Sequence, residues 1–252
     1  MSISQPSFET PGPFTLGGFR FRTSELGPRE AAESENSFWI MKNPGLISGY
    51  NKFIDPIKPK TIVEIGVAGG GGAAFINEKY QPDKLVLIDL EDTTTPLFKE
   101  YLSNPRMANA RFYTGIDQSN QEELGRIALQ ERLIDRGVDL VIDDASHLYK
   151  QTKLSFEYLF PCLREGGVFV IEDWGWAHWN NDFWQKSAFP GEIALSTLIM
   201  QAVMSSGSKP GRIAGIHIDS GLAIITRGPD EIPLSDPIEN YYLNRGKIFP
   251  ML

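Results

Sequence analysis

The stretch VDLVIDDASH at residues 138–147 is followed, after one helix-length segment, by GGVFVIED at residues 166–173. Each run is apolar until it ends in two acids, Asp143 with Asp144 and Glu172 with Asp173. Continuous apolar runs of this kind are typical of parallel strands buried on both faces. The carboxyl ends of such strands meet at the edge of an open α/β sheet where ligands bind. The sequence therefore predicts that these carboxylates converge on one site, where they can bind a cation.

Strand-like and helix-like runs alternate from residue 61 onward. The expected strands are 61–67, 84–90, 110–115, 138–143 and 167–172, and the expected helices are 72–80, 96–105, 121–134, 150–164 and 192–206. Two more strands, 212–218 and 222–227, are joined by a tight turn. This order predicts an α/β fold of the Rossmann-like, doubly wound class, with a mostly parallel seven-stranded sheet that ends in an antiparallel hairpin and helices on both faces.

The remaining segments flank this core. Residues 1–58 are expected to form an N-terminal arm and cap, with one or two helices over 37–57 that break near Pro44. Residues 59–228 form the predicted core, which carries a Trp-rich insertion at 174–190. Residues 229–252 are expected to pack as an irregular tail.

The bulk composition favours one soluble domain. The 252 residues are 41% hydrophobic, which suits one large domain with decorations better than two domains. A formal charge of −8 argues against nucleic acid or an anionic membrane as a partner, because both attract clustered Lys and Arg. With one cysteine, Cys162, and with neither a spanning apolar stretch nor a signal pattern, we expect a cytoplasmic protein without an internal disulfide.

A glycine-rich loop, EIGVAGGGG at residues 64–72, follows the first strand of the core and opens a helix. Glycines at this place let the backbone pass close to a ligand. Asp89 ends the next strand, the position from which a carboxylate accepts hydrogen bonds from ribose hydroxyls. Together they predict a cofactor that contains adenosine, and a glycine turn that only packs a helix on the sheet is the structural alternative.

A nicotinamide cofactor is one reading of this loop. Gly66, Gly70 and Gly72 fit the G-x-x-x-G-x-G spacing of short-chain dehydrogenases, and Tyr149 with Lys153 fits their Y-x-x-x-K pair. However, the glycines lie too far into the chain for that family, and Tyr149 comes too early. An NAD(P)-dependent oxidoreductase therefore stays a rival hypothesis, as does a non-catalytic subunit that binds an adenosine ligand and a structural ion.

The combined motifs resemble those of class I S-adenosylmethionine-dependent methyltransferases. These motifs are E-x-G-x-x-x-G after the first strand, an acid ending the second, D-D-x-S-H after the fourth and E-D after the fifth, before a final antiparallel pair. More closely, residues 60–228 are similar to the metal-dependent O-methyltransferases that modify sugars on macrolide antibiotics, the mycinamicin type. The long N-terminal domain of those enzymes is expected to be missing, so the acceptor pocket and a homo-oligomeric state stay open.

The resemblance implies roles for individual residues. Asp144, Glu172 and Asp173 would bind the metal, and His147 would be the general base. The residues implied in binding S-adenosylmethionine are Glu64, Gly66, Ala68, Gly70 and Asp89, with Asp117 and Gln118 on the adenine side. Because Ile116 separates Gly115 from Asp117, the adenine contacts match the family pattern less well. Asp143 is expected to face the cofactor or to cap the next helix.

These residue types suit methyl transfer to oxygen. A set of carboxylates suits a hard cation, Mg²⁺ or another divalent ion, and open positions on the ion can take two neighbouring hydroxyls of a substrate. An imidazole suits a general base at neutral pH. Surface acids without an ion and a structural histidine are the alternatives for these residues.

Four of the five tryptophans, Trp174, Trp176, Trp179 and Trp184, follow the second acidic doublet within a short segment. We expect Trp174 and Trp176 to line the acceptor site together with His178, although packing within the insertion or a subunit contact explains the tryptophans equally well. The predicted activity is Mg²⁺-dependent methylation of a small hydroxylated molecule, a sugar or glycosylated natural product with vicinal hydroxyls. A catechol-type phenol is the alternative acceptor.

Overall fold

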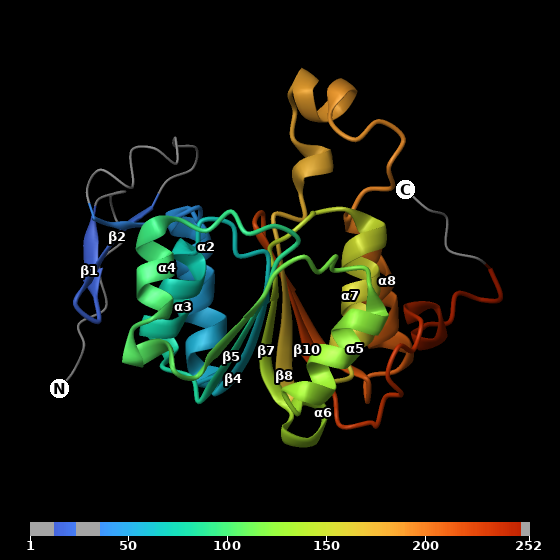
Figure 1. The fold of residues 1–252 in the computed structure, drawn as a ribbon. Coiled ribbons are helices and arrows are strands. Elements are labelled where there is room, and N and C mark those ends of the chain that lie inside the picture. Colours follow the sequence, from blue (N-terminus) through green and yellow to red (C-terminus); the bar gives the residue numbers. More distant parts are fainter. Residues whose placement is uncertain (1–12, 24–35, 248–252) are drawn as a thin grey trace.

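A seven-stranded sheet runs through the centre of the computed structural model, which describes residues 13–23 and 36–247 (Figure 1). Its strands are β4 (Thr61–Ile65), β5 (Lys84–Ile88), β6 (Ala110–Tyr113), β7 (Val138–Asp143), β8 (Leu163–Glu172), β9 (Ile213–Ile218) and β10 (Leu222–Arg227). They lie in the order β6-β5-β4-β7-β8-β10-β9. The first five strands of this order are parallel, and β10 is antiparallel to both of its neighbours. The predicted fold class is thereby confirmed.

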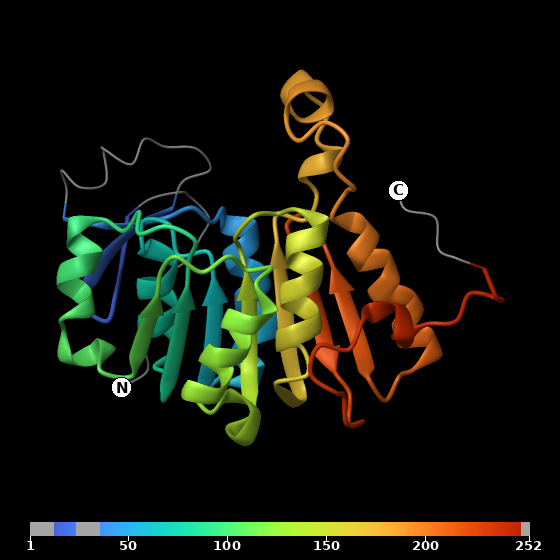
Figure 2. The ribbon, with the colours of Figure 1, turned by 45° about the vertical axis from the view of Figure 1, so that its right-hand side comes forward.

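Helices cover both faces of the sheet (Figure 2). One face carries α2 (Pro44–Gly49), α3 (Gly71–Tyr80) and α4 (Pro96–Leu102), and the other carries α5 (Gln121–Gln130), α6 (Leu133–Arg136), α7 (Tyr149–Leu159) and α8 (Ser196–Ser208). Neighbouring residues of a strand point to opposite faces. In β4, Ile62 packs into one core and Val63 into the other, and both are fully buried. This two-sided burial explains the continuous apolar runs of the sequence.

The N-terminal segment differs from the expectation. Residues 38–40 form a strand, not a helix, because Phe38 and Ile40 are buried on one side with Trp39 between them. This strand, β3 (Phe38–Ile40), pairs in parallel with β2 (Phe19–Thr23), which pairs with β1 (Phe14–Leu16). The parts of the predicted arm and tail at residues 1–12, 24–35 and 248–252 lie outside the described residues.

Pro44 begins a helix where a break was expected. It occupies the first turn of α2, where a missing backbone N–H costs nothing, and the Asn43 side chain accepts a hydrogen bond from the Leu46 N–H at 2.9 Å. The chain continues as a π-helical turn, Tyr50–Ile54, and a 3₁₀ turn, Asp55–Ile57. The segment from β3 to this turn lies against α3, since a Cβ on Gly71 would come within 1.8 Å of the Trp39 carbonyl oxygen.

Two predicted helices end earlier than the sequence suggested. The helix expected over 150–164 ends at Leu159. Phe160 still has helical dihedral angles, but Pro161 has no backbone N–H to continue the helix, and β8 then starts at Leu163. The helix expected over 121–134 divides into α5 and α6 at Arg132, whose φ of 57° is left-handed.

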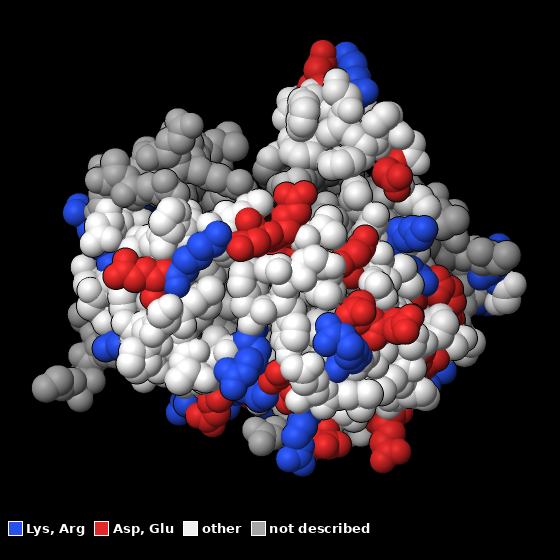
Figure 3. All heavy atoms as spheres, in the orientation of Figure 1, with Lys and Arg blue, Asp and Glu red and all other residues white. Residues whose placement is uncertain are grey.

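The Trp-rich segment rises above the edge of the sheet at which β8 ends (Figures 1 and 2). It contains a 3₁₀ turn, Trp176–His178, and a π-helical turn, Phe183–Ser187. Among the described residues, no helix combines the length and the apolar character that crossing a membrane requires. On the face drawn in Figure 3, acidic and basic side chains are interspersed.

Candidate active site

Two adjoining cavities lie at the carboxyl edge of the sheet and share Gly66, Ala68 and Asp144 in their walls. The first has a volume of about 290 Å³ and is also lined by Glu64, His147, Asp173 and Trp176. The second has a volume of about 480 Å³ and is also lined by Asp89, Asp117, Gln118 and Ser146. An extended ligand can therefore lie along the glycine loop with its two ends in different cavities.

The glycine loop holds a fixed shape between the cavities. Gly66 has a φ of 89°, and a Cβ there would lie 2.1 Å from the carbonyl oxygen of Asp144, so the loop after β4 can contact the loop after β7 only through a glycine. Asp89 Oδ2 accepts hydrogen bonds from the backbone N–H groups of Val67 and Ala68 at 2.7 and 2.9 Å. Asp89 thus braces the loop while it lines the second cavity.

Glu64 is a buried acid with an unfilled hydrogen-bonding position. Its side chain lines the first cavity, is 1% exposed, and its Oε2 has no hydrogen-bond partner within the described part of the chain. Burial raises the pKa of Glu64 to about 8, although the charge of Lys42 acts in the opposite direction. Buried acceptors are almost always satisfied, so an unsatisfied one beside a cavity fits a polar ligand group such as the ammonium group of an amino acid.

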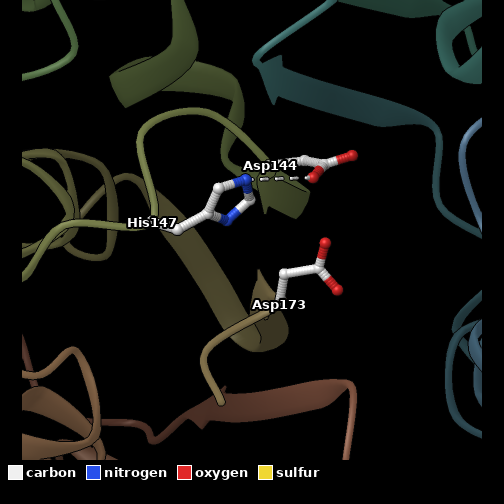
Figure 4. A group of neighbouring side chains, drawn as sticks. All are labelled: Asp144, His147 and Asp173. Atoms are coloured by element: carbon white, nitrogen blue, oxygen red, sulfur yellow. Dashed lines mark ion pairs between the residues drawn. The ribbon is translucent and has the colours of Figure 1, made fainter. Parts of the chain in front are cut away.

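Asp144, His147 and Asp173 converge on the first cavity (Figure 4). Each offers one ligand atom, and these atoms all lie within 4.8 Å of one another, close enough to hold one metal ion. His147 Nε2 lies 3.9 Å from Asp144 Oδ1, while His147 Nδ1 lies 3.3 Å from the Glu172 carbonyl oxygen. Burial raises the pKa of Asp173, and the negative charge of Asp144 raises it further. Two carboxylates that repel each other at a cavity fit a bound cation.

Glu172 is engaged by residues of the N-terminal segment. Both of its carboxylate oxygens lie 2.7 Å from Lys42 Nζ, and the Tyr50 hydroxyl donates to Oε1. Lys42 Nζ also donates to Asp144 Oδ2 at 2.8 Å. Burial raises the pKa of Glu172 to about 7, Asp144 adds to this effect, and Lys42 opposes it. Although burial favours a neutral amine, Asp144 and Glu172 keep the pKa of Lys42 above its usual value.

Asp143 lies beneath the site and lines neither cavity. It is 2% exposed and accepts hydrogen bonds from Gln118 Nε2, at 2.9 and 3.1 Å, and from Ser155 Oγ, at 2.6 Å. Gln118 Oε1 in turn accepts from the Ser146 N–H at 2.9 Å. Asp143 and Gln118 therefore support the loop that carries Asp144 and His147. Asp117 lines the second cavity.

Of the three residues expected at the acceptor site, one lines the first cavity. The Trp176 ring packs 4.0 Å from the His147 ring, centroid to centroid. Trp174 donates from its indole N–H to the Asp219 carbonyl at 2.9 Å and packs against the core. His178 Nε2 lies 2.8 Å from Ser196 Oγ. Neither Trp174 nor His178 borders this cavity.

Lys42 and Tyr50 are site residues that the sequence reasoning missed. The sequence predicts only a cap for the segment that contains them, and no local pattern in the sequence predicts its contact with β8. A weak signal exists in FWIMK at 38–42, where a lysine follows an apolar run directly before a capped helix start at Asn43.

Part of the chain is similar to known proteins. Residues 63–174 match the model of a family described as "Methyltransferase domain". The mycinamicin VI 2''-O-methyltransferase of Micromonospora griseorubida is 29% identical over 192 residues, which cover 68% of this chain and 44% of the relative. The demethylmacrocin O-methyltransferase of Streptomyces fradiae is 33% identical over 105 residues, which cover 36% of this chain and 26% of the relative. The matched segments thus span less than half of either relative.

A solved structure agrees with these relatives. The MycE methyltransferase of the mycinamycin pathway, in complex with Mg, SAH and mycinamycin VI, superposes with a TM-score of 0.57 at 25% identity, over 81% of this chain and 56% of that protein. The chain therefore contains a segment that matches a methyltransferase domain, and it resembles the macrolide-sugar O-methyltransferases of the mycinamicin type.

Proposed function

We propose that this protein transfers a methyl group from S-adenosylmethionine to a hydroxyl of a sugar or glycosylated natural product with vicinal hydroxyls, and that it uses Mg²⁺ to do so. The observation that carries the proposal is the convergence of Asp144, His147 and Asp173 on a cavity whose opposite wall is the glycine loop. Two acids and a potential base stand next to a braced cofactor loop, which is the arrangement that methylation of an alcohol needs.

The two cavities suit the two halves of the cofactor. We assign the adenosine half to the second cavity, because Asp89 and Asp117 line it and carboxylates accept hydrogen bonds from ribose hydroxyls. We assign the methionine half to the first cavity, where Glu64 offers its unsatisfied Oε2 to an ammonium group. When bound, S-adenosylmethionine supplies the methyl group and its own leaving group. The reacting carbon would then lie on the side of Asp144 and His147.

Asp144 and Asp173 are the residues that we expect to hold the cation, since carboxylate oxygens are the ligands that Mg²⁺ prefers. When bound, the cation polarises an acceptor hydroxyl and fixes its direction. Glu172 was expected as a third ligand, but both of its oxygens contact Lys42. His147 has a nitrogen donor, which Mg²⁺ disfavours, so we keep it as the base.

His147 is oriented to accept a proton. If Nδ1 carries the hydrogen, it donates to the Glu172 carbonyl, and the lone pair of Nε2 then faces Asp144 and the cavity. The carboxylate of Asp144 stabilises the imidazolium that forms when Nε2 takes the proton of the acceptor hydroxyl. Trp176 packs on the ring, which restricts its rotation and keeps water from that side.

The cofactor assignment is tested by calorimetric titration with S-adenosylmethionine, S-adenosylhomocysteine and NAD. We expect both sulfur nucleosides to bind and NAD not to bind. Binding of NAD alone would refute the proposal in favour of an oxidoreductase.

The catalytic assignment is tested by methyl transfer to a panel of sugars, glycosides and catechols, read by mass shift. We expect turnover with Mg²⁺ and not with EDTA, and losses of at least about 100-fold for Asp144→Asn and His147→Gln. Asp135→Asn and His217→Gln are matched controls, because Asp135 is an exposed acid of α6 and His217 stacks on Phe53 away from both cavities. Turnover that survives EDTA and Asp144→Asn would refute the metal role, and turnover of catechols alone would correct the acceptor class.

A further inference from the structure

Lys42 places a fixed positive charge inside the acid cluster. Its side chain is 3% exposed, and its Nζ is within hydrogen-bond distance of Asp144 Oδ2 and of both oxygens of Glu172. An ammonium group has three donors, and these three contacts use all of them. Among the described residues that line the first cavity, it is the sole Lys or Arg.

The position of Lys42 is set by packing around it. The residue stands between β3 and the Asn43 cap of α2, and the same segment brings the Tyr50 hydroxyl to Glu172. The fit of Gly71 against the Trp39 backbone holds β3 on the helix that follows the glycine loop. Lys42 is therefore not a surface side chain that folds inward by chance, because the backbone on both sides of it is anchored.

The contacts divide the cluster into an inner and an outer part. The inner part is Glu172, which is 1% exposed and bound by Lys42 and Tyr50. The outer part is Asp144 Oδ1, Asp173 and His147, which face the cavity. Asp144 belongs to both, since its Oδ2 faces Lys42 and its Oδ1 faces His147. A divalent cation in the outer part would contact the carboxylates of Asp144 and Asp173. The charge of the third carboxylate, Glu172, would already be balanced by Lys42.

We propose that Lys42 is a built-in cation that takes Glu172 out of the metal's ligand set, so that the divalent ion binds through Asp144 and Asp173 only. The inference rests on the proposed function for the presence of a metal ion. Its physical reason is that buried carboxylates need a compensating charge, and Lys42 supplies one whether or not an ion is bound. The cluster should then be stable without metal and should bind metal weakly.

Titration of metal-free protein with Mn²⁺ tests the inference, with S-adenosylhomocysteine binding measured on the same samples as a check of the fold. We expect the double variant Lys42→Met/Glu172→Gln to change the Mn²⁺ dissociation constant by less than about 3-fold, because it removes a lysine–glutamate pair whose charges cancel and which lies outside the ligand set. Asp173→Asn should raise it by about 10-fold or more. A rise of 10-fold or more for the double variant Lys42→Met/Glu172→Gln would overturn the inference.

The second arm removes the lysine. In Lys42→Met we expect Glu172 to join the ligand set, so that Mn²⁺ binds about 10-fold more tightly and Glu172→Gln in this background abolishes the gain. Lys79→Met is the matched control, because Lys79 is a partly buried lysine paired with Asp55 away from the site, and it should leave Mn²⁺ binding unchanged. If the Lys42→Met variants do not fold, the melting temperatures of the wild type in EDTA and in Mg²⁺ still decide.

Failure of the inference can be told from failure of the proposed function. No Mn²⁺ binding by the wild type, with S-adenosylhomocysteine still bound, overturns the inference and leaves a methyltransferase without a metal. Mn²⁺ binding with the expected pattern but no binding of S-adenosylhomocysteine supports the inference and overturns the proposed function.

Melting temperatures give an independent readout. We expect the wild type to melt at the same temperature, within about 2 °C, in EDTA and in Mg²⁺, and Lys42→Met to melt lower in EDTA and to recover with Mg²⁺. A wild type that needs Mg²⁺ for its stability would overturn the inference, because Lys42 would then not compensate the acids.

Discussion

Gly70 lies in the glycine loop, and the fold leaves no room for a side chain at this position. Its φ is 88°, and a Cβ there would lie 2.0 Å from Cγ of Phe98, which is fully buried. Both the left-handed backbone and the overlap therefore penalise any other residue. Packing alone requires a glycine at this position, so a glycine-rich loop by itself is weak support for a cofactor.

Gly70→Ala should lower the free energy of unfolding by about 2–4 kcal/mol in denaturant titrations of the cofactor-free protein, because strain and overlap add. Gly69→Ala is the matched control: its Cβ would meet Thr95 at 3.5 Å, an ordinary contact, and its φ is not left-handed. We expect the control to stay within about 1 kcal/mol of the wild type. Equal stabilities of the two variants would contradict the steric explanation.

The Tyr50 hydroxyl offers a second test at the residue scale. Tyr50 is fully buried and donates to Glu172, so Tyr50→Phe should cost about 1–3 kcal/mol of unfolding free energy by leaving a buried carboxylate with one donor fewer. Tyr241 is also fully buried, but its hydroxyl has no hydrogen-bond partner among the described residues. Tyr241→Phe should therefore be neutral or slightly stabilising in the same denaturant titration. A larger loss at Tyr241 than at Tyr50 would refute this assignment of partners.

Which site residues the sequence could predict depends on how each is brought to the site. Asp144, His147 and Asp173 follow strand ends, and strand ends of a parallel sheet meet by topology alone, so their convergence could be predicted. Lys42 reaches the site through the docking of a separate segment, which no local pattern encodes. Asp143 precedes a predicted ligand by one residue, and the alternation of side chains along a strand turns it to the opposite face of β7.

At the scale of elements, the strands of the core were predicted within a few residues, and the N-terminal segment was not. The core strands are apolar runs between turn signals, so burial on both faces leaves a clear pattern. In contrast, β3 has three residues, too few to separate a period of two from a helical period. Its pairing with β2 is a contact between distant segments that only the folded chain defines.

The Trp-rich segment is connected to His147 by a series of contacts between aromatic rings. The Trp184 ring lies 4.6 Å from that of Trp176, which lies 4.0 Å from that of His147, centroid to centroid. Neither Trp176 nor Trp184 belongs to the two cores of the sheet. We therefore expect changes in this segment to affect the cavity beside His147 more than the stability of the fold.

Trp184→Ala should raise the KM for the acceptor by about 3- to 10-fold, because Trp176 loses its support, while the affinity for S-adenosylhomocysteine stays the same. The free energy of unfolding should stay within about 1 kcal/mol, since the ring lies outside the cores. Phe183→Ala is the control: this neighbour is 60% exposed and its one ring contact is with Trp184. If steady-state kinetics showed a larger rise in KM for Phe183→Ala than for Trp184→Ala, the proposed support of Trp176 by Trp184 would be contradicted.

At the scale of the whole molecule, the sheet couples the two cores into one unit. Each central strand sends alternate residues to both cores, and the aromatic side chains of β1, β2 and β3 join one of them through Phe14, Phe21 and Phe38. The rings of Phe21 and Phe38 pack with their planes tilted by 31° and their centroids 5.3 Å apart. The N-terminal segment is thus part of the fold that carries Lys42 and not an appendage, and we expect it to unfold together with the sheet.

Cys162 makes the stability of this unit depend on alkaline pH. It is 3% exposed within the core beside α7, and burial raises the pKa of its thiol to about 12. In the unfolded chain a thiol ionises near pH 8.5, so the unfolded state gains from ionisation that the folded state resists, and stability falls as the pH rises above about 8.5. The slope from this one group is at most about 1.4 kcal/mol per pH unit.

We therefore expect the stability advantage of the wild type over Cys162→Ala, measured by denaturant unfolding, to shrink between about pH 8 and pH 10. Parallel pH profiles of the two proteins would show that the thiol is accessible in the folded state and that the core around it opens before the sheet unfolds.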